Sequence, residues 1–181
     1  MNTIAENIAN FLKENAPFNH LSHDELVEVS NSIGVIILEK NKMLFKIEDK
    51  LHDSFYVVAS GVIHLSFIAD AEETMLNKCY AGDVFGLRPF FAKNNYMMTA
   101  KAREESIIYA IPIETFKPFL AKNSEILNFL LESFAANSKS SLNKENTNRV
   151  LSDNIMFAEN QSDTSFFQSL NYNKKPLLFS Q

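Results

Sequence analysis

Hydrophobic positions recur with a helical period at the start of the chain. Ile4, Ile8 and Leu12 are spaced four residues apart, which predicts a short amphipathic helix on the domain surface. Ser22 with Glu25 three residues later has the form of a capping box. This pair predicts the start of a second helix, so the chain is expected to open with two helices.

The pattern then changes to short runs rich in β-branched and aromatic residues. Ile63, Leu65 and Phe67 alternate with His64 and Ser66, as a strand with one buried face requires. Short strands joined by polar turns and enclosed by helices favour an antiparallel fold over a parallel α/β sheet. We therefore predict mainly β structure with N-terminal and C-terminal helices, an antiparallel β-roll or double-stranded β-helix of jelly-roll type. The predicted strands are Val35–Leu38, Phe55–Val58, Val62–Ile68, Met75–Tyr80, Tyr96–Ala102 and Ser106–Ile111.

Two more helices are predicted after the last strand. Pro112 suits the first turn of a helix, where its missing N–H costs nothing. From Ser124 to Phe134 little of the helix circumference is polar, which indicates either burial against a second surface or a thick core helix. From Ser138 the chain is polar and rich in Ser and Asn. We predict a domain over residues 1–137 and a polar linker or tail over residues 138–181.

Composition and charge narrow the classes of function. A chain of 181 residues with 46% hydrophobic residues is long enough for one well-packed core domain. Its net charge of -5 argues against binding to nucleic acid or to an anionic membrane, because both need clustered Lys and Arg. Cys79 is the only cysteine, which excludes an intrachain disulfide. With neither a leader pattern nor a long apolar run, a cytoplasmic protein is expected.

No catalytic or metal-binding constellation is evident in the sequence. The four histidines are scattered, and Cys79 lies in an apolar run with no evident base. Neither a G-x-S-x-G motif nor a phosphate loop occurs. Glu104 and Glu105 are adjacent, so on a strand they would point to opposite faces. We predict no enzymatic activity, no catalytic residues and no metal site.

Residues Gly82–Phe91 read GDVFGLRPFF, and Tyr96–Ala100 read YMMTA. Together they resemble the phosphate-binding cassette of the cyclic-nucleotide-binding domain family, and the resemblance extends over roughly Pro17–Phe134. In that family a Glu after F-G holds the ribose and an Arg before S/T-A pairs with the cyclic phosphate. Here Leu87 stands in place of the Glu and Met98 in place of the Arg. The resemblance therefore implies a sensor domain with a degenerate cassette.

The pocket chemistry has two open interpretations. Backbone N–H groups of the cassette turn are still able to face an anion, which would retain a site for a small molecule such as a weak or atypical nucleotide. Alternatively, the apolar side chains fill the pocket themselves. Arg88 could swing toward an anion, but we interpret it, like Lys101 and Arg103, as a solvated surface charge. The candidate ligand-binding residues are Phe85, Gly86, Leu87, Arg88, Met98, Thr99 and Ala100.

The wider context is inferred from resemblance. A GDxFGxRP cassette with an AxEESIxYAIP strand is similar to bacterial domains that continue into CBS and nucleotidyltransferase-like domains. We expect a non-catalytic regulatory piece of a longer signalling protein, homodimeric through the helices after the roll. The alternatives are the sensor domain of a catabolite-activator-type transcription regulator and a dimerisation module with no ligand. No basic recognition helix occurs in residues 138–181, so no nucleic-acid contact is predicted.

Overall fold

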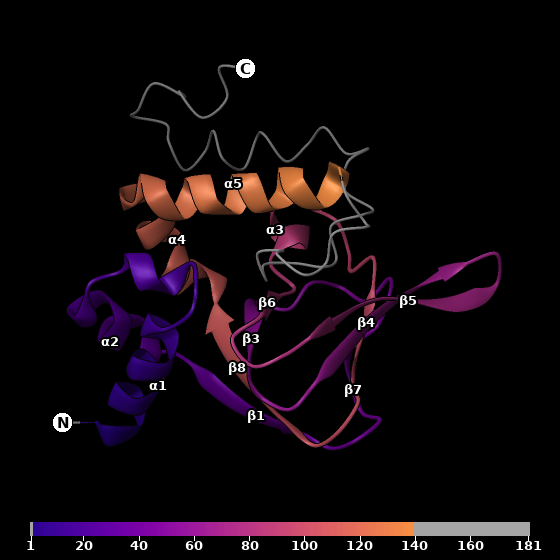
Figure 1. Ribbon diagram of the computed structural model, residues 1–181, viewed down its shortest axis with the longest axis horizontal. Coiled ribbons are helices and arrows are strands. Elements are labelled where there is room, and N and C mark those ends of the chain that lie inside the picture. Colours follow the sequence, from indigo (N-terminus) through magenta and orange to yellow (C-terminus); the bar gives the residue numbers. More distant parts are fainter. Residues whose placement is uncertain (1, 140–181) are drawn as a thin grey trace.

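The computed structural model describes residues 2–139. Its N-terminal part is helical, with α1 (Thr3–Lys13), a single 3-10 turn η1 (Phe18–His20) and α2 (His23–Asn31), which lie side by side at one end of the molecule (Figure 1). The predicted capping box is present: the Ser22 hydroxyl accepts from the Glu25 N–H, and the Ser22 N–H donates to the Glu25 carboxylate at 2.8 Å. Both predicted N-terminal helices are confirmed.

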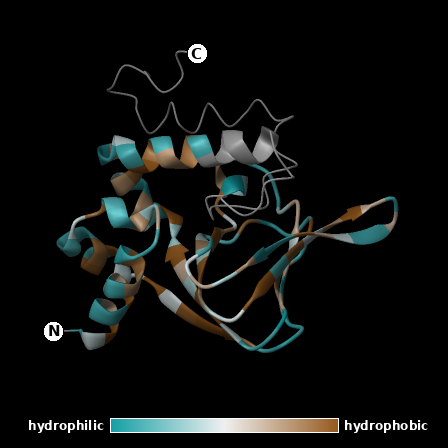
Figure 2. Ribbon diagram, viewed as in Figure 1, coloured by the Kyte–Doolittle hydropathy of each residue, from teal (hydrophilic) through white to brown (hydrophobic). Residues whose placement is uncertain are grey.

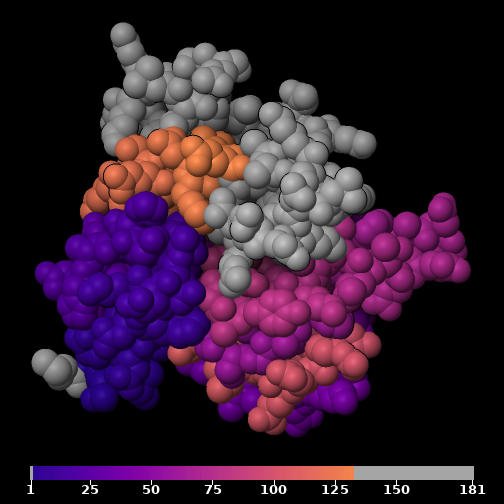
Figure 3. Space-filling model, viewed as in Figure 1, coloured from indigo at the N-terminus to yellow at the C-terminus, as the bar shows by residue number. Residues whose placement is uncertain are grey.

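Eight antiparallel strands form two four-stranded sheets. They are β1 (Gly34–Leu38), β2 (Met43–Phe45), β3 (Ser54–Ser60), β4 (Ile63–Ala69), β5 (Glu72–Cys79), β6 (Val84–Phe85), β7 (Thr99–Ala102) and β8 (Ser106–Pro112). One sheet has the order β1-β8-β3-β6 and the other β2-β7-β4-β5. The end of the β4–β5 hairpin projects from the body of the domain (Figures 1 and 3). This arrangement confirms the predicted antiparallel roll with flanking helices.

The predicted strands do not include β2 and β6, and they place the start of β5 at Met75 and the start of β7 at Tyr96. β7 begins at Thr99 because Tyr96, the predicted first residue, exchanges backbone hydrogen bonds with Glu48 and Asp49 instead of a neighbouring strand. In β4 the pairing register with β5 shifts between Leu65 and Ser66. Ser66 still lies on the outer face, as alternation predicts, but it is only 5% exposed and its hydroxyl donates to the Glu73 carboxylate.

Three helices follow the roll or interrupt it: α3 (Arg88–Ala92), α4 (Ile113–Lys122) and α5 (Ser124–Lys139). Pro112, predicted in the first turn of a helix, is instead the last residue of β8 and the N-cap of α4, one residue before that turn. α5 spans the top of the molecule in Figure 1, above α4. Because α5 continues to Lys139, and the rest of the polar tail lies outside the described residues, the domain boundary at residue 137 stays a prediction. Within residues 2–139, no helix combines the length and apolar character needed to cross a bilayer.

Two hydrophobic clusters lie on opposite faces of β3. Phe55 and Val57 point into a cluster formed with the helices, which we term the helical core. Tyr56 and Val58 point the other way into the space between the two sheets, which we term the roll interior. The strands that divide the clusters are largely hydrophobic along their length (Figure 2). β3 therefore reads as a continuous apolar run because both of its faces are buried.

Candidate ligand-binding site

The candidate cassette begins with a tight turn between β5 and β6. The Asp83 carboxylate accepts a hydrogen bond from the Tyr80 N–H at 2.8 Å, and the Gly82 N–H donates to the Val58 carbonyl at 2.8 Å. Gly86 has a φ of 74°, and a Cβ added there would lie 3.1 Å from the Tyr56 ring. The Asp and second Gly of the motif thus have structural roles, since they fix the turn and allow close packing.

The structure divides the candidate residues between the two clusters. Phe85, Met98 and Ala100 lie together in the roll interior, where Met98 is 2% exposed. Leu87 is 0% exposed, but it packs in the helical core. The side chains at the two positions where the resemblance expects charged anchors are therefore apolar, fully buried and in different clusters.

The interpretation of Arg88 as a solvated surface charge is wrong. Its side chain is only 3% exposed. It is the first residue of α3, where Leu87, Phe91 and Ala92 pack in the helical core. This packing holds the Arg88 side chain at a small cavity between α3 and the segment before β7.

This cavity lies beside the candidate cassette. Its volume is about 20 Å³. That is enough for about one water molecule, whereas small-molecule sites usually measure about 300–1,000 Å³. In this conformation the cavity is far too small for a nucleotide. Its lining residues are Phe45, Arg88, Pro89, Ala92, Tyr96, Met97 and Met98.

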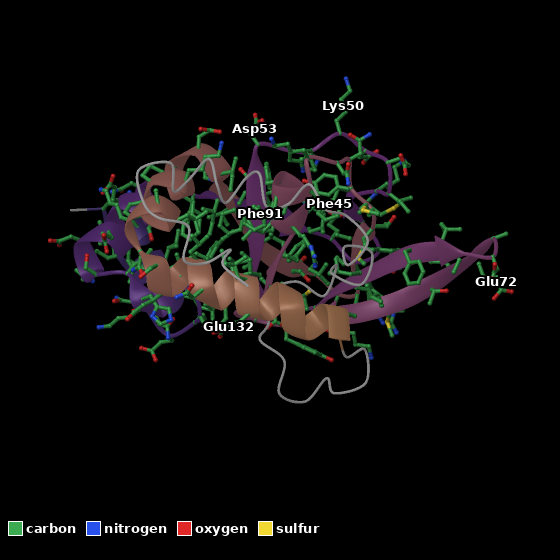
Figure 4. All side chains as sticks on the ribbon, turned by 90° about the horizontal axis from the view of Figure 1, so that it is seen from above. Phe45, Lys50, Asp53, Glu72, Phe91 and Glu132 are labelled. Carbon is green, nitrogen blue, oxygen red and sulfur yellow. The ribbon has the colours of Figure 1, made fainter. Side chains whose placement is uncertain are left out.

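Aromatic rings fill the adjacent roll interior. Phe45 and Tyr96 stack with ring centroids 3.7 Å apart and planes within 6° of parallel. Phe45 also meets Tyr56 and Phe85 with centroid distances of 6.1 and 6.2 Å. In Figure 4 the Phe45 side chain is drawn within the fold, whereas Lys50 extends away from it. Each such ring pair contributes about 0.5–1.5 kcal/mol beyond its buried area, so the cluster stabilises the closed interior.

The polar ends of this cluster bind one another. His52 Nδ1 and the Tyr56 hydroxyl share a short hydrogen bond. The backbone N–H of His52 donates to the Tyr96 hydroxyl at 3.2 Å. Burial raises the pKa of Tyr56 to about 12; a hydrogen bond with Tyr96 opposes this rise, and the nearby Asp53 carboxylate adds to it. Tyr56 therefore stays a neutral phenol at physiological pH.

Thr99 places its hydroxyl in a structural role. Its side-chain oxygen accepts a hydrogen bond from the Ile47 N–H at 3.1 Å. In the same loop, the Lys46 N–H donates to the Asp49 carboxylate at 2.9 Å. Thr99, which was a candidate phosphate ligand, thus holds the loop between β2 and β3 against β7.

His20 and His23, on the N-terminal helices, each lie beside one carboxylate. His20 lies 3.1 Å from the Glu125 carboxylate, and His23 lies 3.3 Å from that of Glu6. In the part of the chain that the structure describes, no group of three or more His, Cys, Asp or Glu side chains is placed to hold a metal ion. Cys79 is buried in the roll interior.

Sequence reasoning did not identify Phe45, His52 and Tyr56 as parts of this cluster. They come from β2, from the loop after it and from β3, so only the fold brings them to Tyr96. One signal was available in the sequence. The uninterrupted apolar run of β3 implies two buried faces, and therefore a second set of side chains opposite the helical core.

The chain is similar to a family model and to several solved structures. Residues 35–123 match the family model described as a cyclic nucleotide-binding domain. The fold is similar to the sensor domain of the transcriptional regulator DNR from Pseudomonas aeruginosa, with a TM-score of 0.66 and 19% identity, covering 79% of this chain and 96% of that chain. It is also similar to the regulatory domain of Toxoplasma gondii PKA in crystals with cAMP, with a TM-score of 0.64 and 18% identity over 74% of this chain and 50% of that chain.

Two further proteins are similar to this chain. One is bound to guanosine, and the other is a much longer protein. The regulatory subunit of a cAMP-independent protein kinase A from Trypanosoma cruzi, bound to guanosine, has a TM-score of 0.65 and 16% identity over 75% of this chain and 48% of that chain. The Drosophila willistoni protein named neuropathy target esterase sws is 26% identical over 122 residues, 61% of this chain. The chain spans only 8% of the length of that protein. At these identities, the solved structures establish the fold.

Proposed function

We propose that the chain is a non-catalytic regulatory module with a degenerate cassette, a proposal supported by the match of residues 35–123 to the model of a cyclic nucleotide-binding domain. In this proposal the roll interior is closed by its own side chains. The module acts in signal transduction as one part of a longer protein, and tight binding of cAMP or cGMP is not among its properties.

The observation that carries this proposal is the burial of Leu87 and Met98 at the two expected anchor positions. A hydrogen bond to a charged group contributes about 1.5–3 kcal/mol, so the absence of both anchors weakens a cyclic nucleotide by about a hundredfold or more. The Phe45–Tyr96 stack adds a second obstacle, because it occupies the roll beside the cassette. A nucleotide would have to displace these rings as well as bind without its usual partners.

The contacts of α5 support an output through the helices after the roll. Asn123 accepts from the backbone N–H groups of Glu125 and Ile126, which caps α5, and its side-chain amide donates to the His20 carbonyl at 2.9 Å. η1 and α5 are thereby tied to each other. We propose that movement of α4 and α5 transmits the state of the module, to a second copy in a homodimer and to domains further along the chain.

The larger protein in this proposal belongs to the bacterial type with CBS and nucleotidyltransferase-like domains. The GDxFGxRP cassette of residues 82–89 supports this assignment. The similarity to a small part of a much longer protein also supports a role as one module among several. The esterase named in that relative is not carried over, since the match spans 8% of its length.

An atypical nucleotide or nucleoside is the ligand class most compatible with a modified cassette. One solved relative is described as cAMP-independent and is bound to guanosine. A neutral nucleoside needs no phosphate anchor, so it fits an interior that has Met98 in place of the Arg. Binding of this kind would require the Phe45–Tyr96 stack to open.

A second candidate is the sensor domain of a transcription regulator. The similarity to 96% of the DNR sensor domain favours it. In that case DNA binding would belong to a separate domain, because the net charge of -5 does not suit contact with a phosphate backbone. A dimerisation module without ligand differs from the first proposal only in that the roll interior never opens.

A thermal-melt series with cAMP, cGMP, AMP and guanosine at millimolar concentration tests the proposal. A ligand at about a hundred times its Kd stabilises the folded state by about 2.7 kcal/mol, which shifts the melting temperature by several degrees. We expect no shift with cAMP or cGMP. A clear rise with either one would show that the cassette works without its charged anchors, and the degenerate cassette would have to be abandoned.

A further inference from the structure

A row of basic side chains crosses three strands on the outer face of the β2-β7-β4-β5 sheet. His64 on β4 is paired with Lys78 on β5 on one side and with Lys101 on β7 on the other. Ile63 and Leu65, the neighbours of His64 along β4, point into the roll interior, so His64 points outward. Lys78 and Lys101 therefore lie on the same face of the sheet, one on each side of His64.

The same face is hollowed. A concavity of about 430 Å³ lies beside the row. This volume is within the range of small-molecule sites and far exceeds the cavity at the cassette. Arg103, two residues beyond Lys101, adds a second cation to its wall. Among residues 2–139, the lining residues are Asn41, His64, Ser66, Glu73, Met75, Lys101, Ala102 and Arg103.

The charges at this concavity are unbalanced. Within residues 2–139, no salt bridge joins Lys78, Lys101 or Arg103 to a carboxylate. Glu73 is the one carboxylate in the lining, and it accepts a hydrogen bond from the Ser66 hydroxyl at 2.7 Å. Two cations in the lining, Lys101 and Arg103, against one carboxylate leave a local excess of positive charge, to which Lys78 adds from the neighbouring strand, in a chain whose net charge is -5.

The pKa of His64 responds to these nearby positive charges. Partial burial lowers its pKa, and the positive charges of Lys78 and Arg103 lower it further. Of the other charged groups at the site, Lys101 acts in the same direction, whereas the Glu73 carboxylate opposes it. An anion in the concavity would offset the cations and raise the pKa of His64.

We propose that this outer-face concavity binds a small polyanion that carries phosphate or carboxylate groups. Lys101 and Arg103 pair with the anionic groups from the wall of the site, Lys78 adds positive charge from a neighbouring strand, and His64 offers its imidazole ring as a hydrogen-bond donor. Met75 offers an apolar contact for the rest of the ligand. The site lies on the opposite face of the sheet from the roll interior, so it does not depend on the state of the cassette.

Isothermal titration and proton NMR of the histidine rings, with inorganic pyrophosphate and with citrate, test this proposal on the full chain. The test variant is Lys101→Gln with Arg103→Gln, and the matched control is Lys13→Gln with Lys50→Gln, which removes the same charge from exposed positions elsewhere. We expect the test variant to raise the Kd for pyrophosphate at least about tenfold, because it removes two charge-assisted contacts. The control should stay within about twofold.

The NMR readout locates the site. Pyrophosphate should raise the pKa of His64 while leaving the resonances of His20 and His23 in place. Glu73→Gln should tighten binding, because it removes the carboxylate that opposes the cations among the described lining residues. Binding of pyrophosphate alone would identify phosphate compounds as the ligand class, and equal binding of citrate would extend the class to polycarboxylates.

Three outcomes would overturn the proposal. The first is no heat and no movement of the His64 resonances at millimolar pyrophosphate or citrate. The second is equal pyrophosphate affinity in the test and control variants, which would put the anion elsewhere. The third is binding of a short polyglutamate peptide but of neither small anion, which would make this face a surface for an acidic protein partner.

Discussion

The two faces of one sheet differ in what their side chains do. Along β7, Ala100 faces the roll interior, whereas Thr99 and Lys101 lie on the other side of the strand. On the inner face, stacked rings leave a cavity of about 20 Å³, and on the outer face a basic concavity measures about 430 Å³. The inner face has the packing of a core, and the outer face carries charge that the fold itself does not use.

This difference separates stability from binding. A closed apolar interior loses stability when any group in it is changed, because the surroundings relax only partly. An unbalanced charged surface behaves in the opposite way, since relieving repulsion stabilises the fold while it weakens an anion site. Substitutions in the roll interior are therefore expected to lower the stability of the fold by a large amount. Substitutions that remove charge from the outer face are expected to raise it by a small amount while they weaken anion binding.

Met98→Arg should have the largest effect. It introduces the charge that a complete cassette is expected to carry, at a position only 2% exposed and surrounded by apolar side chains. We expect a loss of about 4 kcal/mol or more in the free energy of unfolding, measured with urea. Lys101→Gln on the same strand is the control and should change it by about 0.5 kcal/mol or less. A Met98→Arg variant with wild-type stability that binds cAMP would mean that the interior opens readily.

Phe45→Ala tests the aromatic filling of the roll. Removing a buried ring costs about 3 kcal/mol or more through lost burial and the cavity left behind. The Ile68→Ala control, at a side chain 55% exposed, should cost about 0.5 kcal/mol or less. Equal midpoints of urea unfolding for the two variants would show that the Phe45–Tyr96 stack contributes nothing to the closed state.

Tyr56 gives the interior a signature at alkaline pH. Its pKa of about 12 in the folded protein exceeds the ordinary value of 10.0. The folded state therefore holds this proton more tightly, so the contribution to stability is complete below about pH 10 and is lost as the pH rises toward about 12. Across that window we expect wild type to lose about 1 kcal/mol more than Tyr56→Phe in urea unfolding.

The exposed Tyr80 provides the control for this pH effect. Tyr80→Phe should follow the wild-type curve, since its side chain is half exposed. If Tyr56→Phe and wild type lost stability in parallel between about pH 10 and pH 12, the hydroxyl of Tyr56 would not be part of a closed polar network.

Lys78→Glu should give the smallest effect and the opposite sign. It removes one cation from the row that includes Lys101 and Arg103 and puts a carboxylate in its place. We expect a gain of about 0.5 kcal/mol in the free energy of unfolding at low salt, which disappears at about 1 M salt through screening. Lys50→Glu, in a loop, should show no such gain. Destabilisation by Lys78→Glu would contradict an electrostatic conflict in this row.

The sequence predicted the elements whose signals are local. The spacing of Ile8 and Leu12 and the Ser22–Glu25 capping box gave the first two helices. The same reasoning failed where partners far along the chain decide the outcome. Tyr96 pairs with a loop instead of a strand, and Arg88 is buried because α3 packs in the helical core.

The candidate site was predictable only in part. Resemblance identified Leu87 and Met98 as departures from a charged pattern, but it could not give the volume left beside them, which depends on a stack between Phe45 and Tyr96. The basic row was not predictable, since His64 and Lys101 become neighbours only through the register of β4 and β7. Taken singly, these side chains have the pattern of ordinary surface residues.

An amide NMR map of the chain titrated with cAMP compares the two faces in one experiment. We expect the amides of Gly86, Leu87 and Thr99 to stay in place, and any movement caused by the phosphate to appear at His64, Ser66 and Lys101 on the outer face. Displacement of the Gly86, Leu87 and Thr99 amides with saturation at micromolar cAMP would contradict a closed roll interior and establish a working cassette.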